Sequence, residues 1–279
     1  MSSTKPENVL ITGASGGIGR ACALYMSKRG YFVIGTSRSL TRMSTVEEEA
    51  ERQGNALTAV ELDINDESSI ENAIPGLIQK YGTIDVLINN AGYGLWGSGQ
   101  SLSNCEMRSQ MDTNFFAPFR LMKAVLPGML DQGNGTIINV SSILGRIGTP
   151  FNGAYAASKF ALEGLSESMR VELWPFGVRV VLMEPGYIKT DFHENQVIAS
   201  LSESPDLPYA GYKASNNRSG YEMLATDPIK VARKAHAIVR SKHPRFRYTI
   251  NKEATIGVLC ARLMPERLFQ AILSRATMG

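Results

Sequence analysis

Short runs of apolar, often β-branched residues alternate with helix-like segments along most of this chain of 279 residues. One such segment, GRACALYMSKRG at 19–30, carries apolar residues at helical spacing and ends on a glycine. Runs without polar alternation are typical of strands buried on both faces, and strand–helix–strand repeats connect parallel strands through right-handed crossovers. We therefore predict a doubly wound α/β fold with seven parallel strands and helices on both faces. The predicted strands are residues 8–13, 31–37, 57–63, 85–92, 135–142, 178–186 and 246–250.

The alternation predicts a single domain over residues 1–279, since no linker, repeat or low-complexity block interrupts it. Residues 187–226 are loop-like and rich in Ser, Asn, Gly and Pro, and they follow the sixth predicted strand. Ligands of open α/β sheets bind at the carboxyl ends of strands, so we predict that this segment is a substrate lid.

The C-terminal tail, residues 253–279, is amphipathic around Pro265. We expect it to pack on its own domain. The alternatives are that it lines a substrate entrance, forms a subunit contact or touches a membrane surface. Its apolar side chains are Leu259, Leu263, Leu268, Phe269 and Ile272.

Charge and composition narrow the class of protein. A net charge of +3 is too small and too dispersed for a nucleic-acid-binding surface, and we interpret the basic stretch 240–247 as a solvated loop. The polar N-terminus and the absence of 18 consecutive apolar residues predict neither a signal peptide nor a transmembrane segment. Three cysteines without CxxC spacing favour a reducing, cytoplasmic location. The three histidines lack metal-ligand spacing, so we predict no metal site, with His193 a candidate lid residue.

A glycine-rich turn, LITGASGGIGRA, joins the first predicted strand to the first helix. A dinucleotide site requires a tight turn, close approach of the backbone to a pyrophosphate, and a helix N-terminus directed at the negative charge. The predicted cofactor contacts in this turn are Gly13, Ser15, Gly17, Ile18 and Gly19.

The spacing G-x-x-x-G-x-G resembles that of the short-chain dehydrogenase/reductase family in its single-domain form. Four further motifs agree with this resemblance: NNAG at 89–92, a serine pair at 141–142, YAASK at 155–159 and PGYIKT at 185–190. The resemblance extends to about residue 190 and implies a Rossmann fold that binds a nicotinamide dinucleotide. A looser similarity links YAASKFALEGL and the tail to hydroxysteroid and retinol dehydrogenases.

The end of the second predicted strand bears on the choice of cofactor. A carboxylate there would bind the adenosine ribose and repel a 2′-phosphate, but this chain has Ser37 and Arg38 instead. Because a guanidinium binds phosphate in bidentate fashion, we predict that NADP(H) is preferred over NAD(H). The resemblance further implies cofactor contacts at Asp63, Asn90, Gly92, Tyr155, Lys159, Pro185, Gly186, Ile188 and Thr190.

Tyr155 and Lys159 lie four residues apart and therefore on one face of a helix. A free phenol has a pKa of about 10. We expect the neighbouring ammonium, together with an oxidised nicotinamide, to lower the pKa of Tyr155, so that it serves as a general acid and base. The resemblance implies that Ser142, rather than its rival Ser141, holds the substrate oxygen, and that Asn114 holds Lys159 and a proton-relay water.

These features predict an NADP(H)-dependent oxidoreductase that acts on a ketone or secondary alcohol of large, apolar character, similar to a steroid or retinoid. The alternatives are a 3-oxoacyl carrier-protein reductase and a non-catalytic NADP(H)-sensing protein. The resemblance also implies a homodimer or homotetramer that pairs through the helices carrying Asn114 and Tyr155.

Overall fold

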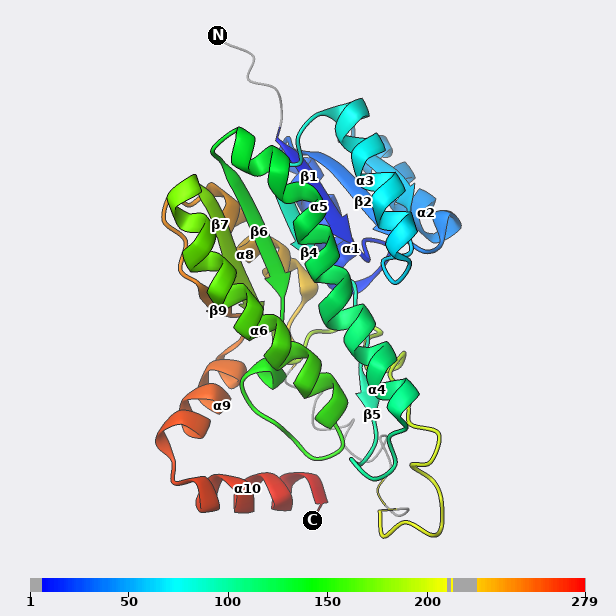
Figure 1. Ribbon diagram of the computed structural model, residues 1–279, viewed down its shortest axis with the longest axis vertical. Coiled ribbons are helices and arrows are strands. Elements are labelled where there is room, and N and C mark those ends of the chain that lie inside the picture. Colours follow the sequence, from blue (N-terminus) through cyan, green and yellow to red (C-terminus); the bar gives the residue numbers. More distant parts are fainter. Residues whose placement is uncertain (1–6, 210–211, 213–224, 279) are drawn as a thin grey trace.

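The computed structural model describes residues 7–209, 212 and 225–278, and these residues contain a seven-stranded parallel sheet (Figure 1). Its strand order is β3-β2-β1-β4-β6-β7-β9, and every pairing is parallel. The predicted fold is confirmed. The strands are β1 (Asn8–Thr12), β2 (Phe32–Ser37), β3 (Leu57–Glu61), β4 (Val86–Asn89), β6 (Gly135–Val140), β7 (Val178–Glu184) and β9 (Arg247–Thr249).

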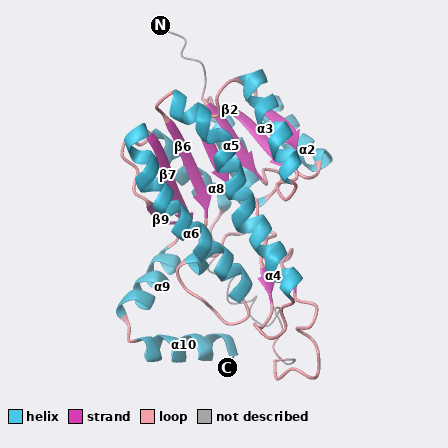
Figure 2. Ribbon diagram, viewed as in Figure 1, coloured by secondary structure: helices cyan, strands magenta, loops and turns pink. Residues whose placement is uncertain are grey.

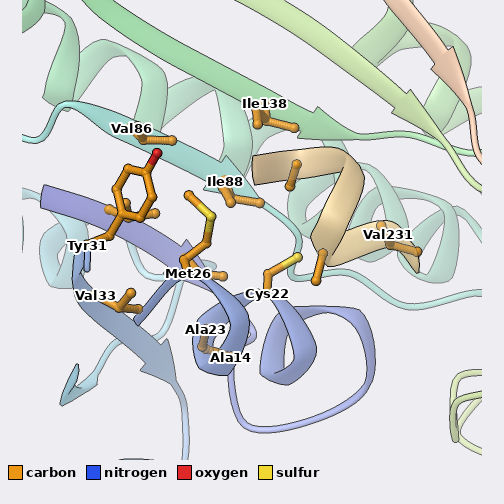
Figure 3. Close-up of a cluster of buried hydrophobic side chains, with 14 of the residues drawn as sticks. Ala14, Cys22, Ala23, Met26, Tyr31, Val33, Val86, Ile88, Ile138 and Val231 are labelled. Atoms are coloured by element: carbon orange, nitrogen blue, oxygen red, sulfur yellow. The ribbon is translucent and has the colours of Figure 1, made fainter. Parts of the chain in front are cut away.

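Helices cover both faces of the sheet, and each face has its own apolar core (Figure 2). One core receives side chains from α1 (Gly17–Lys28), α2 (Leu40–Arg52) and α8 (Pro228–Arg240). The other receives them from α3 (Glu67–Tyr81), α5 (Ala117–Asp131) and α6 (Gly153–Leu173). Figure 3 shows Cys22 and Met26 of α1 near Ile88 of β4 and Val231 of α8, all of which are buried. The strands read as uniformly apolar because both of their faces are covered.

The strand order reverses between β1 and β4, where the chain returns from β3 to the opposite side of β1. Side-chain hydrogen bonds join the carboxyl ends of these two strands. The Thr12 hydroxyl accepts the backbone N–H groups of Asn90 and Ala91 at 3.0 Å each, and the Asn90 amide donates to the Thr12 carbonyl at 2.9 Å. Ligands of doubly wound sheets bind at such a switch point, so this edge is where the site is expected.

Several observed strands end earlier than predicted. β4 ends at Asn89, β6 at Val140 and β7 at Glu184, so residues 90–92, 141–142 and 185–186 leave the sheet. We predicted that these residues belong to the strands because apolar and small residues continue past the last hydrogen-bonded pair of each strand. The structure places them at the carboxyl edge, where the functional residues gather.

The described part of the predicted lid, residues 187–209, 212 and 225–226, is more ordered than a plain loop. β8 (Val197–Ile198) pairs with β5 (Leu95–Trp96) in a small parallel sheet that the sequence did not predict. Two backbone hydrogen bonds join the start of this segment to its end. The Lys189 N–H donates to the Thr226 carbonyl, and the Thr226 N–H donates to the Tyr187 carbonyl, both at 2.9 Å. Residues 210–211 and 213–224 of the predicted lid lie outside the described residues.

The tail forms two helices, α9 (Lys252–Leu263) and α10 (Glu266–Met278), on either side of Pro265. The expectation that its apolar side chains pack on the domain is wrong for most of them. In α9 only Ala254 is buried. Four of the apolar side chains are about half exposed or more: Leu259 (53%), Leu263 (70%), Leu268 (51%) and Ile272 (48%). The helices extend from the end of the sheet (Figure 1), so few core residues lie within their reach.

Replacing Gly19 with alanine is expected to destabilise the fold. A Cβ at this position would overlap the carbonyl oxygen of Gly13 and lie 2.5 Å from the Asn90 amide nitrogen, and backbone overlaps of this kind require the chain to shift. We expect a loss of about 1–3 kcal/mol in the free energy of unfolding, measured by urea denaturation. Gly16→Ala is the control, since its Cβ would meet only the Arg42 guanidinium at 3.7 Å. Equal stability of the two variants would contradict this packing.

Candidate active site

A cleft of about 2720 Å³ lies at the carboxyl edge of the sheet. Drug-sized ligands occupy roughly 300–1,000 Å³, so this volume accommodates a dinucleotide and a second molecule together. The glycine turn, the loops after β2, β4, β6 and β7, the described lid and one face of α10 all contribute to the lining.

The glycine turn forms one end of the cleft. Gly13 and Gly17 have φ angles of +65° and +51°, which favour glycine because L side chains are strained there. The helix α1 begins after Gly16 without a side-chain cap, so its first backbone N–H groups remain available to an anion. Ser15 and Ile18 also line the cleft. This end therefore suits the pyrophosphate of a dinucleotide.

Two arginines line the cleft near this turn. Arg38 follows β2, and Ser37 donates a hydrogen bond to the Ser15 hydroxyl at 3.1 Å. Arg42, which sequence reasoning missed, lies within the first turn of α2, with its guanidinium 3.7 Å from where a Cβ on Gly16 would stand. Its spacing of four residues from Arg38 was the available signal. Both arginines therefore line the same cleft as the glycine turn.

Three of the predicted site residues do not line this cleft. Gly19 is buried where α1 packs against the turn, and Asn114 is fully buried. Asp63 is exposed, and its carboxylate accepts the N–H of Asn65 at 3.0 Å. The cleft wall beside Asp63 is made instead by Leu62, Ile64 and Asn65.

Tyr155 and Lys159 project from the first turns of α6 and are both buried, at 8% and 5% exposure. The Lys159 ammonium nitrogen lies 5.7 Å from the centroid of the Tyr155 ring and donates to the Val140 carbonyl at 2.9 Å. The neighbouring positions Ala154 and Ala156 are small and buried, so α6 approaches the strands closely. The structure thus brings the phenol and the ammonium together in one wall of the cleft.

For the protein alone, burial dominates the pKa of Tyr155, and the lowering expected from Lys159 together with an oxidised nicotinamide stays a prediction. Burial raises the pKa of the Tyr155 phenol to about 12, against a lowering effect from its hydrogen bond with Ser142. Burial lowers the pKa of Lys159 to about 8, against a raising effect from the charge of Glu163. Removal from water disfavours both charged forms, and here it outweighs the opposing effects of Ser142 and Glu163.

The two candidate serines face different surroundings. Ser142 begins the short helix η2 (Ile143–Gly145), accepts the Leu144 N–H at 3.1 Å and hydrogen bonds with Tyr155. The hydroxyl of Ser141 is buried without a hydrogen-bond partner among the described residues. The geometry therefore favours Ser142 as the partner of Tyr155.

Asn114 lies in η1 (Asp112–Phe116), a π-helical segment between α4 (Asn104–Met111) and α5. Its amide nitrogen donates to the Tyr93 carbonyl at 3.0 Å and to the Ser158 hydroxyl at 3.1 Å, and its oxygen accepts the Tyr93 N–H at 3.2 Å. Single π turns occur often at functional sites. Here the turn directs Asn114 to the loop after β4 and to α6, whereas Lys159 is held by Val140.

The segment after β7 forms the opposite wall of the cleft. Gly186 N–H donates to the Asn251 side chain at 3.2 Å, and a Cβ on Gly186 would lie 2.5 Å from that same oxygen. Ile188 forms a bridge with Thr226, and the Thr190 methyl would contact a Cβ on Gly17 at 3.2 Å. The predicted contacts after β7 and those of the glycine turn therefore face one cleft. Pro185, Gly186, Ile188, Thr190, Asn90 and Gly92 all line it.

Aromatic side chains that sequence reasoning missed line the part of the cleft beyond Tyr155. Trp96 and Phe151 stack with ring centroids 4.9 Å apart, and the Phe192 ring lies 5.7 Å from that of Tyr155. Phe151 has a φ of +63°, unusual for a non-glycine residue. His193 lines the same region, as expected of a lid residue, and lies against Tyr187.

Comparisons with known proteins identify the family of this chain. A family model described as short chain dehydrogenase matches residues 7–199. The 3-ketodihydrosphingosine reductase of Bacteroides thetaiotaomicron is 36% identical over 273 residues, 96% of this chain and 97% of that protein. Human retinol dehydrogenase 8 is 43% identical over 201 residues, 71% of this chain and 63% of that protein.

Solved structures share the fold. A short-chain dehydrogenase from Streptomyces avermitilis gives a TM-score of 0.83 at 30% identity and covers 99% of both chains. A metagenomic short-chain oxidoreductase in complex with NADP gives a TM-score of 0.72 at 27% identity, covering 89% of this chain and 98% of the other. Among the described residues of the present protein, no helix is both long and apolar enough to span a membrane.

Replacing Asn114 with alanine is expected to weaken the site's framework. The change removes the acceptor of the Tyr93 N–H, whereas the Tyr93 carbonyl keeps Gln110 and the Ser158 hydroxyl keeps the Tyr155 carbonyl. Loss of a buried hydrogen-bond partner costs about 1–3 kcal/mol in the free energy of unfolding. Urea denaturation measures the loss. Thr113→Ala is the matched control in the same π turn, because its hydroxyl bonds only the exposed Ser109 carbonyl. A loss no greater for Asn114→Ala than for the control would refute this role.

Proposed function

Because this chain belongs to the short-chain dehydrogenase/reductase family, we propose that it is an NADP(H)-dependent oxidoreductase that interconverts a large apolar ketone and its secondary alcohol. The observation that carries the proposal is the convergence of Tyr155, Ser142 and Lys159 on the cleft that also contains the glycine turn. A phenol, a hydroxyl and an ammonium at one point can move a proton to or from a substrate oxygen.

When bound, NADP(H) supplies or accepts the hydride. During ketone reduction the Tyr155 hydroxyl donates its proton to the substrate oxygen, and during alcohol oxidation the phenolate takes a proton back. Ser142 hydrogen bonds with Tyr155 and holds the substrate oxygen beside it. The Lys159 ammonium, 5.7 Å from the ring, stabilises the phenolate that the transfer leaves behind. Burial keeps water from competing for the phenol.

The preference for NADP(H) is supported by the charges next to the glycine turn. Arg38 and Arg42 line this end of the cleft, and no acidic residue occupies positions 36–39. Two guanidinium groups favour a ligand that carries an additional phosphate. The NADP complex of a structural neighbour is consistent with this preference.

A large apolar substrate is supported by the walls beyond Tyr155. Trp96, Phe151 and Phe192 contribute aromatic surface, and Phe269 and Leu273 of α10 close the far side. Two relatives are named for retinol and for 3-ketodihydrosphingosine. We therefore propose that residues 187–226 act as the lid and that α10 lines the substrate entrance.

The two alternative functions are less well supported. The C-terminal tail argues against a 3-oxoacyl carrier-protein reductase, and the Ser142–Tyr155–Lys159 group argues against a non-catalytic sensor.

Self-association and location belong to the same proposal. Large apolar side chains remain exposed on the helices that carry Asn114 and Tyr155, among them Phe116 (41%) and Phe160 (46%). They support pairing of two copies through η1–α5 and α6, in a homodimer or homotetramer.

The free thiols of Cys22, Cys105 and Cys260 fit a reducing compartment such as the cytoplasm.

Tyr155→Phe tests the proposed chemistry. Removing the phenolic hydroxyl removes the proton donor, so kcat for NADPH-dependent ketone reduction is expected to fall by about 10²–10⁴-fold. NADPH affinity, measured by fluorescence titration, should be retained. Tyr93→Phe removes a hydroxyl elsewhere in the cleft and should keep most of the turnover. Unchanged turnover in Tyr155→Phe would exclude this mechanism, whereas NADPH binding without turnover in the wild type would favour a sensor.

Arg38→Ser tests the cofactor preference. Loss of a charge-assisted hydrogen bond to phosphate should weaken NADPH binding by about ten- to a hundred-fold and leave NADH binding nearly unchanged. Dissociation constants for both dinucleotides, measured by calorimetry, provide the comparison. Arg52→Ser, at the exposed far end of α2, serves as the charge control. If both dinucleotides weaken equally with Arg38→Ser, the residue does not select NADP(H).

A further inference from the structure

A cluster of charged side chains lies behind Lys159, away from the cleft. Arg247 of β9 donates to Glu163 and Glu167 of α6, each at 2.9 Å, and also lies 3.4 Å from Glu184 of β7. Arg146 pairs with the same Glu184 oxygen at 3.1 Å. The side chains of Glu163 and Glu184 are only 5% and 1% exposed, whereas that of Glu167 is 63% exposed. The cluster therefore has a buried part and a solvent-facing part.

Glu163 differs from the other carboxylates because it stands one helical turn after Lys159. Residues four apart on a helix share a face, so Glu163 and Lys159 project from the same side of α6, and Glu163 also binds Arg247 of β9. One Glu163 oxygen accepts from Arg247, and the other is buried without a hydrogen-bond partner among the described residues.

Close packing fixes the segment around this carboxylate. A Cβ on Gly145 would lie 2.6 Å from the Ser141 hydroxyl, 3.0 Å from Glu163 Cγ and 3.3 Å from the Lys159 carbonyl oxygen. Glycine at this position allows η2 to lie directly on α6. The turn after β6, which carries Ser142, and the helix turn that carries Lys159 thus meet at Glu163.

Holding Arg247 does not explain why Glu163 is charged and buried. Glu184 and Glu167 already supply carboxylates to that guanidinium, and burying a further charge is costly unless it is paired. Lys159, four residues before Glu163 and also buried, is the other cation on this side of α6. The charged or titratable groups around the pair are Tyr155 and Glu167 on α6, Arg247 on β9, Glu184 on β7 and Arg146 after η2.

We propose that Glu163 is a positioning residue that acts through Lys159: its carboxylate, fixed by Arg247, keeps the buried lysine charged and directed at Tyr155. This inference rests on the proposed function, because the charge on Lys159 matters only if Tyr155 transfers a proton. Burial lowers the pKa of Lys159 and the Glu163 charge opposes that effect, which agrees with the geometry.

The direct test is a pH titration of Lys159 by NMR in the full-length protein labelled with ¹³C-lysine. The Lys159 Cε signal is assigned by its loss in Lys159→Met. We expect a midpoint of about 8 in the wild type. In Glu163→Gln, which keeps the shape and one acceptor, the midpoint should fall by about one unit or more. Glu163→Asp retains the charge and should recover much of the wild-type value.

Glu167→Gln is the matched control. It removes a carboxylate from the same Arg247, on the same helix and at the same 2.9 Å, but at the exposed side. Its Lys159 midpoint should equal that of the wild type. An unchanged midpoint in Glu163→Gln, or an equal fall in both glutamine variants, would overturn the proposal. If Glu163→Gln does not fold, Arg247→Met serves instead: removing the competing cation should raise the midpoint, and no rise there would likewise overturn it.

The pH profile of ketone reduction gives a second readout. The Lys159 ammonium is lost as pH rises through its pKa, so a lower pKa moves the alkaline decline of kcat in Glu163→Gln to lower pH. The decline in Glu167→Gln should coincide with that of the wild type. Absence of turnover in the wild type would refute the proposed function, while the NMR titration would still decide the charge of Lys159. Normal turnover with coincident profiles in all variants would refute the role of Glu163 alone.

Discussion

Parallel pairing of seven strands, of which the inner ones are buried on both faces, is the constraint on which the rest of the structure depends. Side chains within such strands are apolar because helices cover each face, so polar chemistry is confined to the residues where strands end. All carboxyl ends of a parallel sheet lie at one edge. Segments after β1, β2, β4, β6 and β7, distant in sequence, therefore meet in one cleft. The reversal of strand order between β1 and β4 opens the space for a ligand there.

Burial also sets the electrostatic state of the catalytic group. Tyr155 and Lys159 are both withdrawn from water, which favours the neutral form of each. The pKa of Tyr155 is raised to about 12, and the pKa of Lys159 is lowered to about 8. A phenol held in its protonated form is suited to donate a proton to a ketone. In the proposed mechanism, additional positive charge is then required to stabilise the phenolate, and we propose that Glu163 helps Lys159 to supply it.

Much of the fold could be predicted from local pattern, because uniform apolar runs and a glycine turn leave few alternatives. The pairing of Tyr155 with Lys159 was predictable from helix periodicity, and the choice of Ser142 beside them came from the family resemblance. Interactions between segments distant in sequence were not predictable. The pairing of β5 with β8 and the inward position of Phe192 depend on the lid's path. Asp63 and the tail side chains are exposed because no other segment that the structure describes packs over them. Local sequence periodicity does not reveal such packing between distant segments. The direction of the Tyr155 pKa shift required the burial that only packing reveals.

A crystal structure of the protein with NADP⁺ bound tests the central claim most directly. The account predicts the 2′-phosphate between Arg38 and Arg42, the pyrophosphate at the glycine turn and α1, and the nicotinamide ring beside the Tyr155 hydroxyl and the Lys159 ammonium. A dinucleotide bound outside this cleft, or a nicotinamide ring remote from both side chains, would contradict it.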